Sequence, residues 1–498
     1  MTQSKNLLSK ATSYFCVLWL LWLLAAALCA QTPPAQQPPD QKQNQTSDKV
    51  NEAAGPPTET KESRISPQEA EELFGEVDQI LRFAHRDSSF PIKHEVKRRL
   101  TNRDEVVAYL EKSMREDKSA KRVERSALVL KKFGLLPRDF DLSSFLVALL
   151  REQIAGYYDP KTKTMNLLDW VPPEQQRPVL AHELTHALQD QSFGLEKWMK
   201  AGDIDIDRKK VITPADIEAD ETDEVKEAVV EGQAEAVMLD YVLAAVGKSI
   251  VNSPDMLATL DAEMMAGSPD SVEFKSAPIF LKESLTFPYR YGVKFVAALL
   301  ENGGKEKAFP GVFTNPPHST RQIMEPQTYL SGEVVPPMPV PDFRQDFKDY
   351  ERFDVGSISE FDTSMLVEQY AGMKESREVY PGWRGGYYYS ARPKGNPAAP
   401  LALLYVSRWA NDSKAQEFAG IYAKSLAQRY KNVKQNDPDL PQDLQHIGTL
   451  TGTHTWQTED GPVVIEVHGD TVMAAESLDP ATTKQLEKEV FALAGAAH

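Results

Sequence analysis

The segment that most constrains the fold is residues 178–188, Pro-Val-Leu-Ala-His-Glu-Leu-Thr-His-Ala-Leu. Its apolar residues predict a helix that is packed inside the protein. His182 and His186, at i and i+4, then project from one face of that helix and can bind one Zn²⁺, with Glu183 beside the open position of the metal. The alternative, two surface histidines on an ordinary helix, fits the apolar neighbours poorly. The sequence therefore predicts a buried metal site.

A second apolar segment, residues 227–237, carries three glutamates at helical spacing, Glu227, Glu231 and Glu235. Like charges on one helix face repel, so this stripe is either solvated or faces a cation. The neighbouring alanine, valine and methionine residues indicate burial, and an unpaired buried carboxylate is costly. A catalytic zinc takes three protein ligands and leaves its fourth position for water. We therefore expect the stripe to supply the third ligand.

These two segments resemble the zinc helices of gluzincin metallopeptidases. Residues 182–190 are similar to the active-site helix of thermolysin-type gluzincins. Residues 231–234, Glu-Gly-Gln-Ala, resemble the Glu-Gly-x-Ala helix by which aminopeptidase-like gluzincins supply a glutamate ligand. The resemblance implies one Zn²⁺ per chain, held by His182, His186 and Glu231.

Two acidic residues are candidates for orienting the ligand histidines. Glu235, one turn after Glu231, matches the acidic position that hydrogen-bonds a ligand histidine in such enzymes. Asp190, one turn beyond His186, is the other candidate. The alternative for Asp190 is a plain residue near the C-terminal end of the helix, because spacing alone does not identify such oriented carboxylates.

Further motifs extend the resemblance beyond the zinc helices. They occupy residues 135–142, 153–160, 287–292 and 316–323. Over residues 75–345 the chain resembles bacterial secreted proteins of the peptidase-MA-like group, which implies a mostly helical zincin-like catalytic domain with a small edge sheet. In gluzincins extended substrate adds to the strand before the zinc helix, and this implies such an edge at residues 164–168. The alternative is an ordinary covered strand.

The chemistry that the resemblance implies is hydrolysis of peptide bonds. Bound Zn²⁺ lowers the pKa of its water, and Glu183 takes the proton as that water attacks the scissile carbonyl, then passes it to the leaving amine. A second electrophile usually helps to hold the oxyanion. His318, Tyr289 and Tyr291 are candidates, since they are polar-tipped residues in the motifs above. The alternative for the tyrosines is a structural place in the core or at its rim.

Between the two zinc helices, residues 193–224 form a polar segment with an alternating Asp203, Asp205 and Asp207. Arg208 stands where a calcium-binding EF-hand loop has glycine, and Pro214 where it has the bidentate glutamate. We therefore expect a solvated loop.

The first 66 residues have the pattern of an export signal followed by a tether. Lys5 and Lys10 precede an apolar run at residues 14–30, which is typical of a signal peptide within residues 1–30. An uncleaved signal anchor is the alternative, because the run reaches the lower limit for a spanning helix. Residues 31–66, rich in proline and glutamine, are predicted to be disordered. We expect a secreted or periplasmic protein, or one tethered to the membrane through residues 14–30 with its domains outside.

A proline-rich stretch at residues 336–341 marks a boundary between a catalytic domain at 67–345 and an accessory domain at 346–498. In the accessory domain the patterns predict a small α+β module with one covered sheet. Its predicted strands are 386–390, 401–408, 463–467 and 471–475, and its predicted helices are 412–430 and 480–495. The fold class of the whole chain is therefore predicted to be α+β.

The charge and the cysteine content of the chain limit the classes of partner and the kind of stabilisation to be expected. With 56 Lys and Arg against 73 Asp and Glu, the net charge of −17 argues against a nucleic-acid partner. Both cysteines, Cys16 and Cys29, lie in the first thirty residues, so no disulfide framework holds the folded part. The predicted partner is a protein or peptide substrate. The competing interpretation is a cell-envelope binding or assembly protein with a structural zinc, and Glu183 argues against it because a structural site needs no base.

Overall fold

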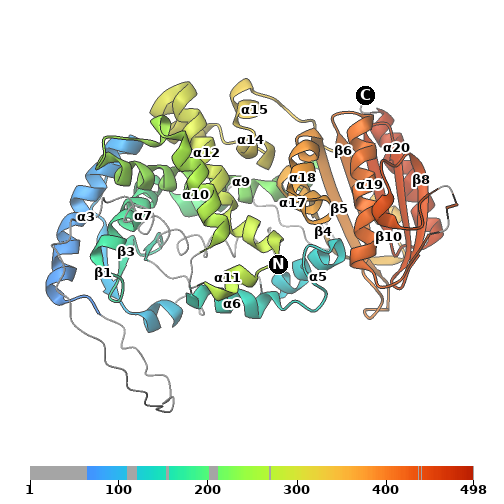
Figure 1. The fold of residues 1–498 in the computed structure, drawn as a ribbon, viewed down its shortest axis with the longest axis horizontal. Helices are drawn as coiled ribbons and strands as arrows, with labels where there is room; N and C mark the ends of the chain where they lie inside the picture. Colours follow the sequence, from blue (N-terminus) through green and yellow to red (C-terminus); the bar gives the residue numbers. More distant parts are fainter. Residues whose placement is uncertain are drawn as a thin grey trace, which may run out of the picture.

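The computed structural model describes residues 64–108, 120–152, 156–200, 211–267, 271–435, 437–438 and 440–496. The predicted signal at 1–30, nearly all of the predicted tether and the run from Asp203 to Asp207 lie outside the described residues. The fold is α+β, as predicted, with a helical part beside a strand-rich C-terminal part (Figure 1). In the described ranges, no helix combines the length and the apolar character that crossing a membrane requires.

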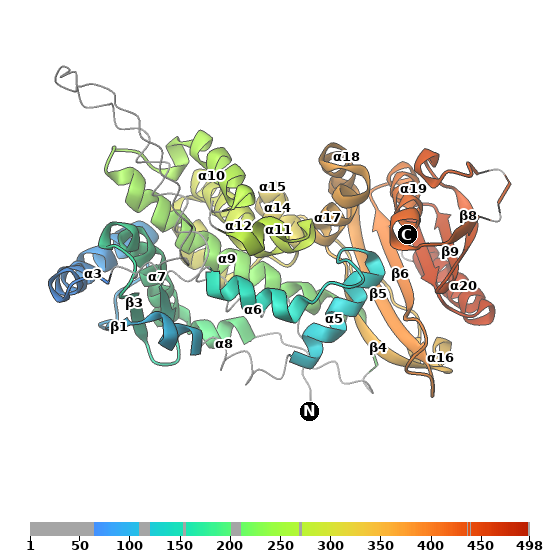
Figure 2. The same cartoon turned by 60° about the horizontal axis from the view of Figure 1, so that its bottom comes forward.

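Three long helices form the centre of the helical part: α7 (Pro173–Phe193), α9 (Pro214–Ala244) and α12 (Ile279–Glu306). α9 packs against both α7 and α12, and α3 (Pro67–Ser88) packs against α7 (Figure 2). The shorter helices are α5 (Ala120–Phe133), α6 (Leu142–Glu152), α8 (Leu195–Lys200), η1 (Ile250–Asn252), α10 (Pro254–Ala266), α11 (Val272–Ser276), η2 (Lys307–Gly311), α13 (Val312–Thr314), α14 (Thr320–Met324) and α15 (Pro326–Ser331).

The acidic residues 214–224 form the first turns of α9, so the expected loop is wrong for this stretch. Thr213 Oγ accepts a hydrogen bond from the Asp216 amide, and the Asp216 carboxylate accepts one from the Thr213 amide. Pro214 occupies the first turn, where its missing N–H costs nothing. These helix-start signals outweigh the polar composition.

A small sheet of three strands lies beside α7, in the order β1-β3-β2. β3 (Thr164–Leu168) pairs in parallel with β1 (Lys97–Thr101) and antiparallel with β2 (Tyr157–Asp159). The expectation that residues 164–168 form the sheet edge is therefore wrong, and the alternative of a covered strand holds. β1 and β2 are the two edge strands of this sheet, and β2 lies against α7.

The C-terminal part is a seven-stranded antiparallel sheet in the order β4-β5-β6-β10-β9-β8-β7. Its strands are β4 (Tyr350–Ser357), β5 (Trp383–Pro393), β6 (Ala402–Trp409), β7 (Val433–Gln435), β8 (Gly452–Thr458), β9 (Gly461–His468) and β10 (Thr471–Glu476). Its helices are α16 (Phe343–Asp346), α17 (Glu360–Ala371), α18 (Met373–Val379), η3 (Tyr380–Gly382), α19 (Asp412–Arg429), η4 (Leu444–His446) and α20 (Pro480–Ala496). β6 and β10 are buried along nearly their whole length because side chains on both faces join a hydrophobic core.

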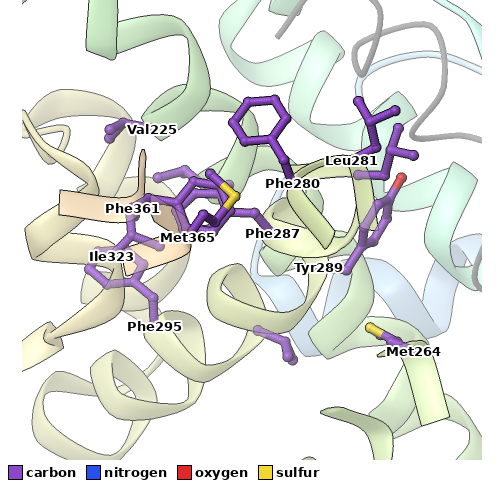
Figure 3. Close-up of a cluster of buried hydrophobic side chains, with 14 of the residues drawn as sticks. Val225, Met264, Phe280, Leu281, Phe287, Tyr289, Phe295, Ile323, Phe361 and Met365 are labelled. Carbon is purple, nitrogen blue, oxygen red and sulfur yellow. The ribbon is translucent and has the colours of Figure 1, made fainter. Parts of the chain in front are cut away.

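The two predicted domains share their buried core. Phe361 of α17 lies 4.1 Å from Phe287 of α12 between ring centroids, and Met365 lies beside the same ring (Figure 3). Phe133, the last residue of α5, packs edge-on against Tyr405 of β6 at 5.5 Å. Side chains on both sides of residue 345 thus belong to one apolar cluster.

Candidate metal centre

Helix α7 carries the first two candidate ligands and the candidate base in the interior of the protein. His182 is 3% exposed, Glu183 1% and His186 6%. The prediction of a buried helix is confirmed, since the residues from Val179 to Asp190 are all buried. The helix ends at Gly194, whose φ of 64° suits glycine at a helix C-terminus.

Helix α9 brings Glu231 to the two histidines because it crosses α12 at very short range. A Cβ atom on Gly232 would lie 2.2 Å from the carbonyl carbon of Gly292, and one on Gly292 would lie 2.3 Å from the Ala228 carbonyl oxygen. Any side chain at either position would force the helices apart. The glycine in the Glu-Gly-x-Ala segment and the one at the end of the 287–292 motif therefore set the position of Glu231.

Three ligand atoms meet at this point. His182 Nε2 lies 3.1 Å from Glu231 Oε2 and 3.1 Å from His186 Nε2. His186 Nε2 lies 3.3 Å from Glu231 Oε2. Within the described residues, this is the one group of three or more His, Cys, Asp and Glu side chains that could hold a metal ion. The structure thus brings together the three predicted ligands, with Glu231 rather than Glu227 or Glu235 at the centre.

The electrostatics of the group suit a bound cation. Burial raises the pKa of Glu231, but the charge of His186 and the hydrogen bond with His182 outweigh it and lower the pKa to about 2. Burial lowers the pKa of His182, whereas the carboxylates of Glu231 and Glu235 raise it to about 10. These carboxylates favour positive charge at the facing ring nitrogens, and a metal cation supplies the same compensation.

Glu183 is held at one oxygen and left unpaired at the other. Its Oε2 accepts a hydrogen bond of 2.8 Å from the backbone amide of Tyr158, on the edge strand β2. Its Oε1 is buried and has no hydrogen-bond partner among the described residues. Burial raises the pKa of Glu183 to about 7, although the two histidines and the Tyr158 amide act in the opposite direction. A carboxylate with this pKa can take up and release a proton near neutral pH.

Each ligand histidine has an orienting side chain at its outer nitrogen. Glu235 Oε2 faces His182 Nδ1 at 3.6 Å, which is within ion-pair range but longer than the hydrogen bond that the resemblance implies at this position. Gln189 Oε1 lies 2.9 Å from His186 Nδ1. The prediction that Asp190 orients a ligand histidine is wrong, because the neighbouring Gln189 occupies that place.

Asp190 instead fastens the β2-β3 hairpin to the end of α7. Its Oδ2 accepts a hydrogen bond of 3.0 Å from the Tyr158 hydroxyl and one from Lys163 Nζ, and its Oδ1 accepts one of 3.1 Å from the Leu195 amide. Because the Tyr158 amide holds Glu183, Asp190 supports the candidate base through the hairpin.

Of the three candidate electrophiles, only Tyr289 lies beside the group. Its ring stacks on that of His182 with 6.2 Å between centroids. Tyr291 lies two residues further, about 200° around α12, and its ring packs 5.2 Å from that of Phe287. Figure 3 shows Phe287 and Tyr289 on opposite sides of the helix. Tyr291 therefore faces α17 rather than the metal centre, and its predicted catalytic role is wrong.

His318 also lies away from the metal centre. Its charge lowers the pKa of Glu218, which burial raises. Glu218 precedes Glu231 by thirteen residues of α9, which corresponds to about 20 Å along the helix. The His318 amide donates a hydrogen bond to Gln322, in the first turn of α14. The structure therefore places His318 near the start of α9 and does not bring it to the metal centre, where the prediction expected it.

Comparison with known proteins adds one match. A family model described as a domain of unknown function (DUF8575) matches residues 347–487, which span most of the C-terminal part. No curated protein and no solved structure matches the chain. The matched region excludes α7 and α9, which carry the residues of the metal centre.

Proposed function

We propose that this protein is a zinc-dependent metallopeptidase of the gluzincin type. The observation that carries the proposal is the meeting of His182, His186 and Glu231 around one point, with an unpaired oxygen of Glu183 in the same buried group. The donor set is two imidazole nitrogens and one carboxylate oxygen, which is a common set for catalytic zinc.

The spacing of the ligand atoms fits zinc. Tetrahedral zinc with bonds of about 2.0–2.2 Å keeps its ligand atoms about 3.3–3.6 Å apart. The three distances here are 3.1, 3.1 and 3.3 Å, so one meets this range and two are about 0.2 Å shorter. Calcium and magnesium prefer oxygen ligands, so two ring nitrogens favour zinc over either.

Each residue of the metal centre has its own role in the proposed peptide hydrolysis. Zinc supplies a Lewis acid that lowers the pKa of water and polarises a carbonyl. Glu183 Oε1 accepts the proton of the attacking water and returns it to the leaving amine. The hydrogen bond from the Tyr158 amide keeps the carboxylate of Glu183 in one orientation, and the carboxylate of Glu235 faces the outer nitrogen of His182 at ion-pair distance.

The proposed substrates are proteins or peptides outside the cytoplasm. The support for this location is the charged and then apolar pattern of the first thirty residues. N-terminal sequencing of the mature protein tests it: a start near Ala27 or Ala30 indicates a cleaved signal, and an intact Met1 on membrane-bound protein indicates an anchor.

The test of catalysis is the Glu183→Gln variant of the full chain. We expect zinc content equal to wild type and a loss of about 10²–10⁴-fold in cleavage of an unfolded test protein, because the base is gone while the ligands remain. Glu174→Gln is the matched control, since Glu174 lies on the same helix with 76% of its side chain exposed. Equal cleavage by Glu183→Gln would remove the proposed mechanism. Zinc binding without any cleavage by wild type would favour the structural-zinc alternative.

A further inference from the structure

We propose that two buried glutamines, Gln189 and Gln233, form a relay that fixes the proton of His186 on Nδ1 and so presents its Nε2 to the metal. The inference rests on the metal site of the proposed function and adds two positioning residues to it. Both glutamine side chains lie in the interior, with 0% exposure.

The relay is a continuous chain of hydrogen bonds. Gln233 Nε2 donates to the backbone carbonyls of Ala308 at 2.7 Å and Phe309 at 3.0 Å. Gln189 Nε2 donates to Gln233 Oε1 at 2.9 Å and to the Val230 carbonyl at 3.0 Å. Gln189 Oε1 then faces His186 Nδ1 at 2.9 Å.

Backbone carbonyls fix the direction of every bond in this chain. A carbonyl oxygen only accepts, so the amide group that faces Ala308 and Phe309 has to be the NH₂ end of Gln233. The side-chain oxygen of Gln233 then faces Gln189, and Gln189 must donate a hydrogen bond to it. The Val230 carbonyl also accepts a hydrogen bond from the NH₂ group of Gln189, so the side-chain oxygen of Gln189 faces His186. His186 Nδ1 is therefore the donor, and in the neutral ring Nε2 keeps its lone pair.

The chain starts at an irregular turn. Ala308 and Phe309 belong to η2, a π-helical turn that follows directly on α12. A π-turn has a wider hydrogen-bond spacing than an α-helix and is frequent at functional sites. The carbonyls of this turn thus fix the Gln233 amide, and α12 is tied to the metal centre through that amide as well as through the crossing at Gly232.

The relay differs from the partner of the other histidine. Glu235 presents a carboxylate to His182 Nδ1, whereas Gln189 presents a neutral amide to His186 Nδ1. A neutral relay sets the tautomer without adding another negative charge to a group that already contains Glu231 and Glu235. Gln189 and Gln233 are thus positioning residues, and they act through His186.

The first test measures Co²⁺ affinity of the full chain by competition with a chelator. We expect Gln189→Met to weaken binding by about 10–100-fold, as is typical when an orienting partner of a ligand histidine is lost. Gln233→Met should weaken it less, and the double variant should lose no more than Gln189→Met alone, because Gln233 acts through Gln189. Gln189→Glu keeps an acceptor for His186 but sets a carboxylate oxygen against the Val230 carbonyl and Gln233 Oε1, so it should recover only part of the affinity.

Gln176→Met is the matched control. Gln176 is also buried on α7, at 1% exposure, and its side chain bonds the backbone of Leu168 and Val171 rather than any residue of the metal centre. We expect this variant to unfold more easily and to keep the Co²⁺ affinity of wild type. Equal losses in Gln176→Met and Gln189→Met would overturn the relay, since both would then report general destabilisation.

The second test reads the tautomer of the neutral His186 ring in metal-free protein by ¹⁵N NMR, at a pH high enough for the imidazole to be neutral. We expect the neutral ring to carry its proton on Nδ1 in wild type and to lose that single tautomer in Gln189→Met. A neutral wild-type ring with its proton on Nε2, or unchanged Co²⁺ affinity in Gln189→Met, would overturn the relay. If wild type binds neither Co²⁺ nor Zn²⁺, the proposed function fails, and the NMR measurement still decides the relay.

Discussion

Among the buried polar clusters of the described residues, the one around Glu476 and the metal centre differ in how completely their atoms are hydrogen-bonded. In the C-terminal part, Glu476 is fully buried and accepts hydrogen bonds from Arg429, Tyr422 and Tyr430. Lys132 Nζ, from α5, lies 3.9 Å from the same carboxylate. Both oxygens of Glu476 are therefore satisfied, and the remaining donors of Arg429 bond the Lys132 carbonyl and a serine hydroxyl.

The metal centre is equally buried and much less satisfied. Glu183 Oε1, His182 Nδ1 and both oxygens of Glu235 have no hydrogen-bond partner among the described residues. Fully paired networks make a core rigid, whereas unpaired buried groups cost free energy and persist where a ligand or a reaction uses them. The difference indicates that Glu476 and Arg429 stabilise the contact between α5 and the sheet, and it supports the proposal that the metal centre binds a ligand.

Removing a metal ligand should cause the largest loss of zinc affinity. It should leave the hydrogen bonds of the cluster around Glu476 unchanged. If zinc binding contributes about 10–16 kcal/mol, one of three protein ligands accounts for about 3–5 kcal/mol. We therefore expect Glu231→Ala to lose about 10²–10⁴-fold in zinc affinity, measured by chelator competition. Stoichiometric zinc retained at wild-type affinity would contradict the assignment of Glu231 as a ligand.

Breaking the C-terminal cluster should give the opposite pattern. Glu476→Gln leaves Arg429 buried without a charge partner, so the free energy of unfolding should fall by about 3–5 kcal/mol in urea denaturation. Zinc affinity should stay at the wild-type level. Glu375→Gln, at an exposed position of α18, is the control and should change stability by less than about 0.5 kcal/mol. A loss of zinc in Glu476→Gln would show that the two clusters are coupled.

The same carboxylate predicts a pH dependence. Burial raises the pKa of Glu476, but Arg429 and Lys132 outweigh it and hold the pKa below the ordinary 4.5. A lowered folded pKa contributes stability above pH 4.5 that is lost as the pH falls through the folded pKa. The difference in unfolding free energy between wild type and Glu476→Gln should therefore shrink below pH 4.5. A constant difference from pH 7 to pH 3 would contradict the ion pair.

Pushing α9 away from α12 should lower zinc affinity, because it moves the backbone that carries Glu231. Gly232→Ala places a methyl group against Gly292, and such overpacking costs about 1–3 kcal/mol. Zinc affinity should fall with it, because Glu231 moves with α9. Gly75→Ala is the control of opposite sign: Gly75 lies within α3 with open space around it, so alanine should stabilise by about 0.5–1 kcal/mol. Full stability and zinc affinity in Gly232→Ala would refute the close crossing.

The smallest effect concerns the hairpin that holds Glu183. Tyr158→Phe removes the hydrogen bond to Asp190 and should cost about 1 kcal/mol of unfolding free energy. Cleavage should fall while zinc content stays unchanged, because the base loses support and the ligands do not. Lys163→Met should change less, since 56% of the Lys163 side chain is exposed. A larger effect from Lys163 than from Tyr158 would reverse this order.

The sequence predicted those parts of the fold that depend on local pattern. α7 and the region of α9 around Glu231 carry strong periodic apolar patterns, and the six elements predicted for the C-terminal sheet all occur near their expected positions. Strands β4 and β8 were missed because their segments are largely polar or half-exposed, and the alternation of β8 carries one large apolar residue, Trp456. β1 was missed for the same reason, and with it the pairing that makes β3 a central strand.

The candidate site was predictable where spacing along one helix decides it. His182, Glu183 and His186 share α7, and the resemblance added Glu231. The side of a helix that a particular residue faces is harder to predict from the sequence. Asp190 and Gln189 are neighbours, yet only Gln189 faces His186. A glutamine within an apolar helical run was the available signal, because a buried amide requires hydrogen-bond partners. The place of His318 depends on how α14 packs against α9, which no local pattern encodes.

Metal analysis of the full chain purified in zinc-containing medium is the most direct test of the metal centre and its proposed chemistry. We predict about one zinc per chain, with cleavage of an unfolded test protein that stops on chelation and returns when zinc is restored. A chain that contains no zinc, or that cleaves at the same rate after chelation, would contradict a zinc peptidase built on His182, His186 and Glu231.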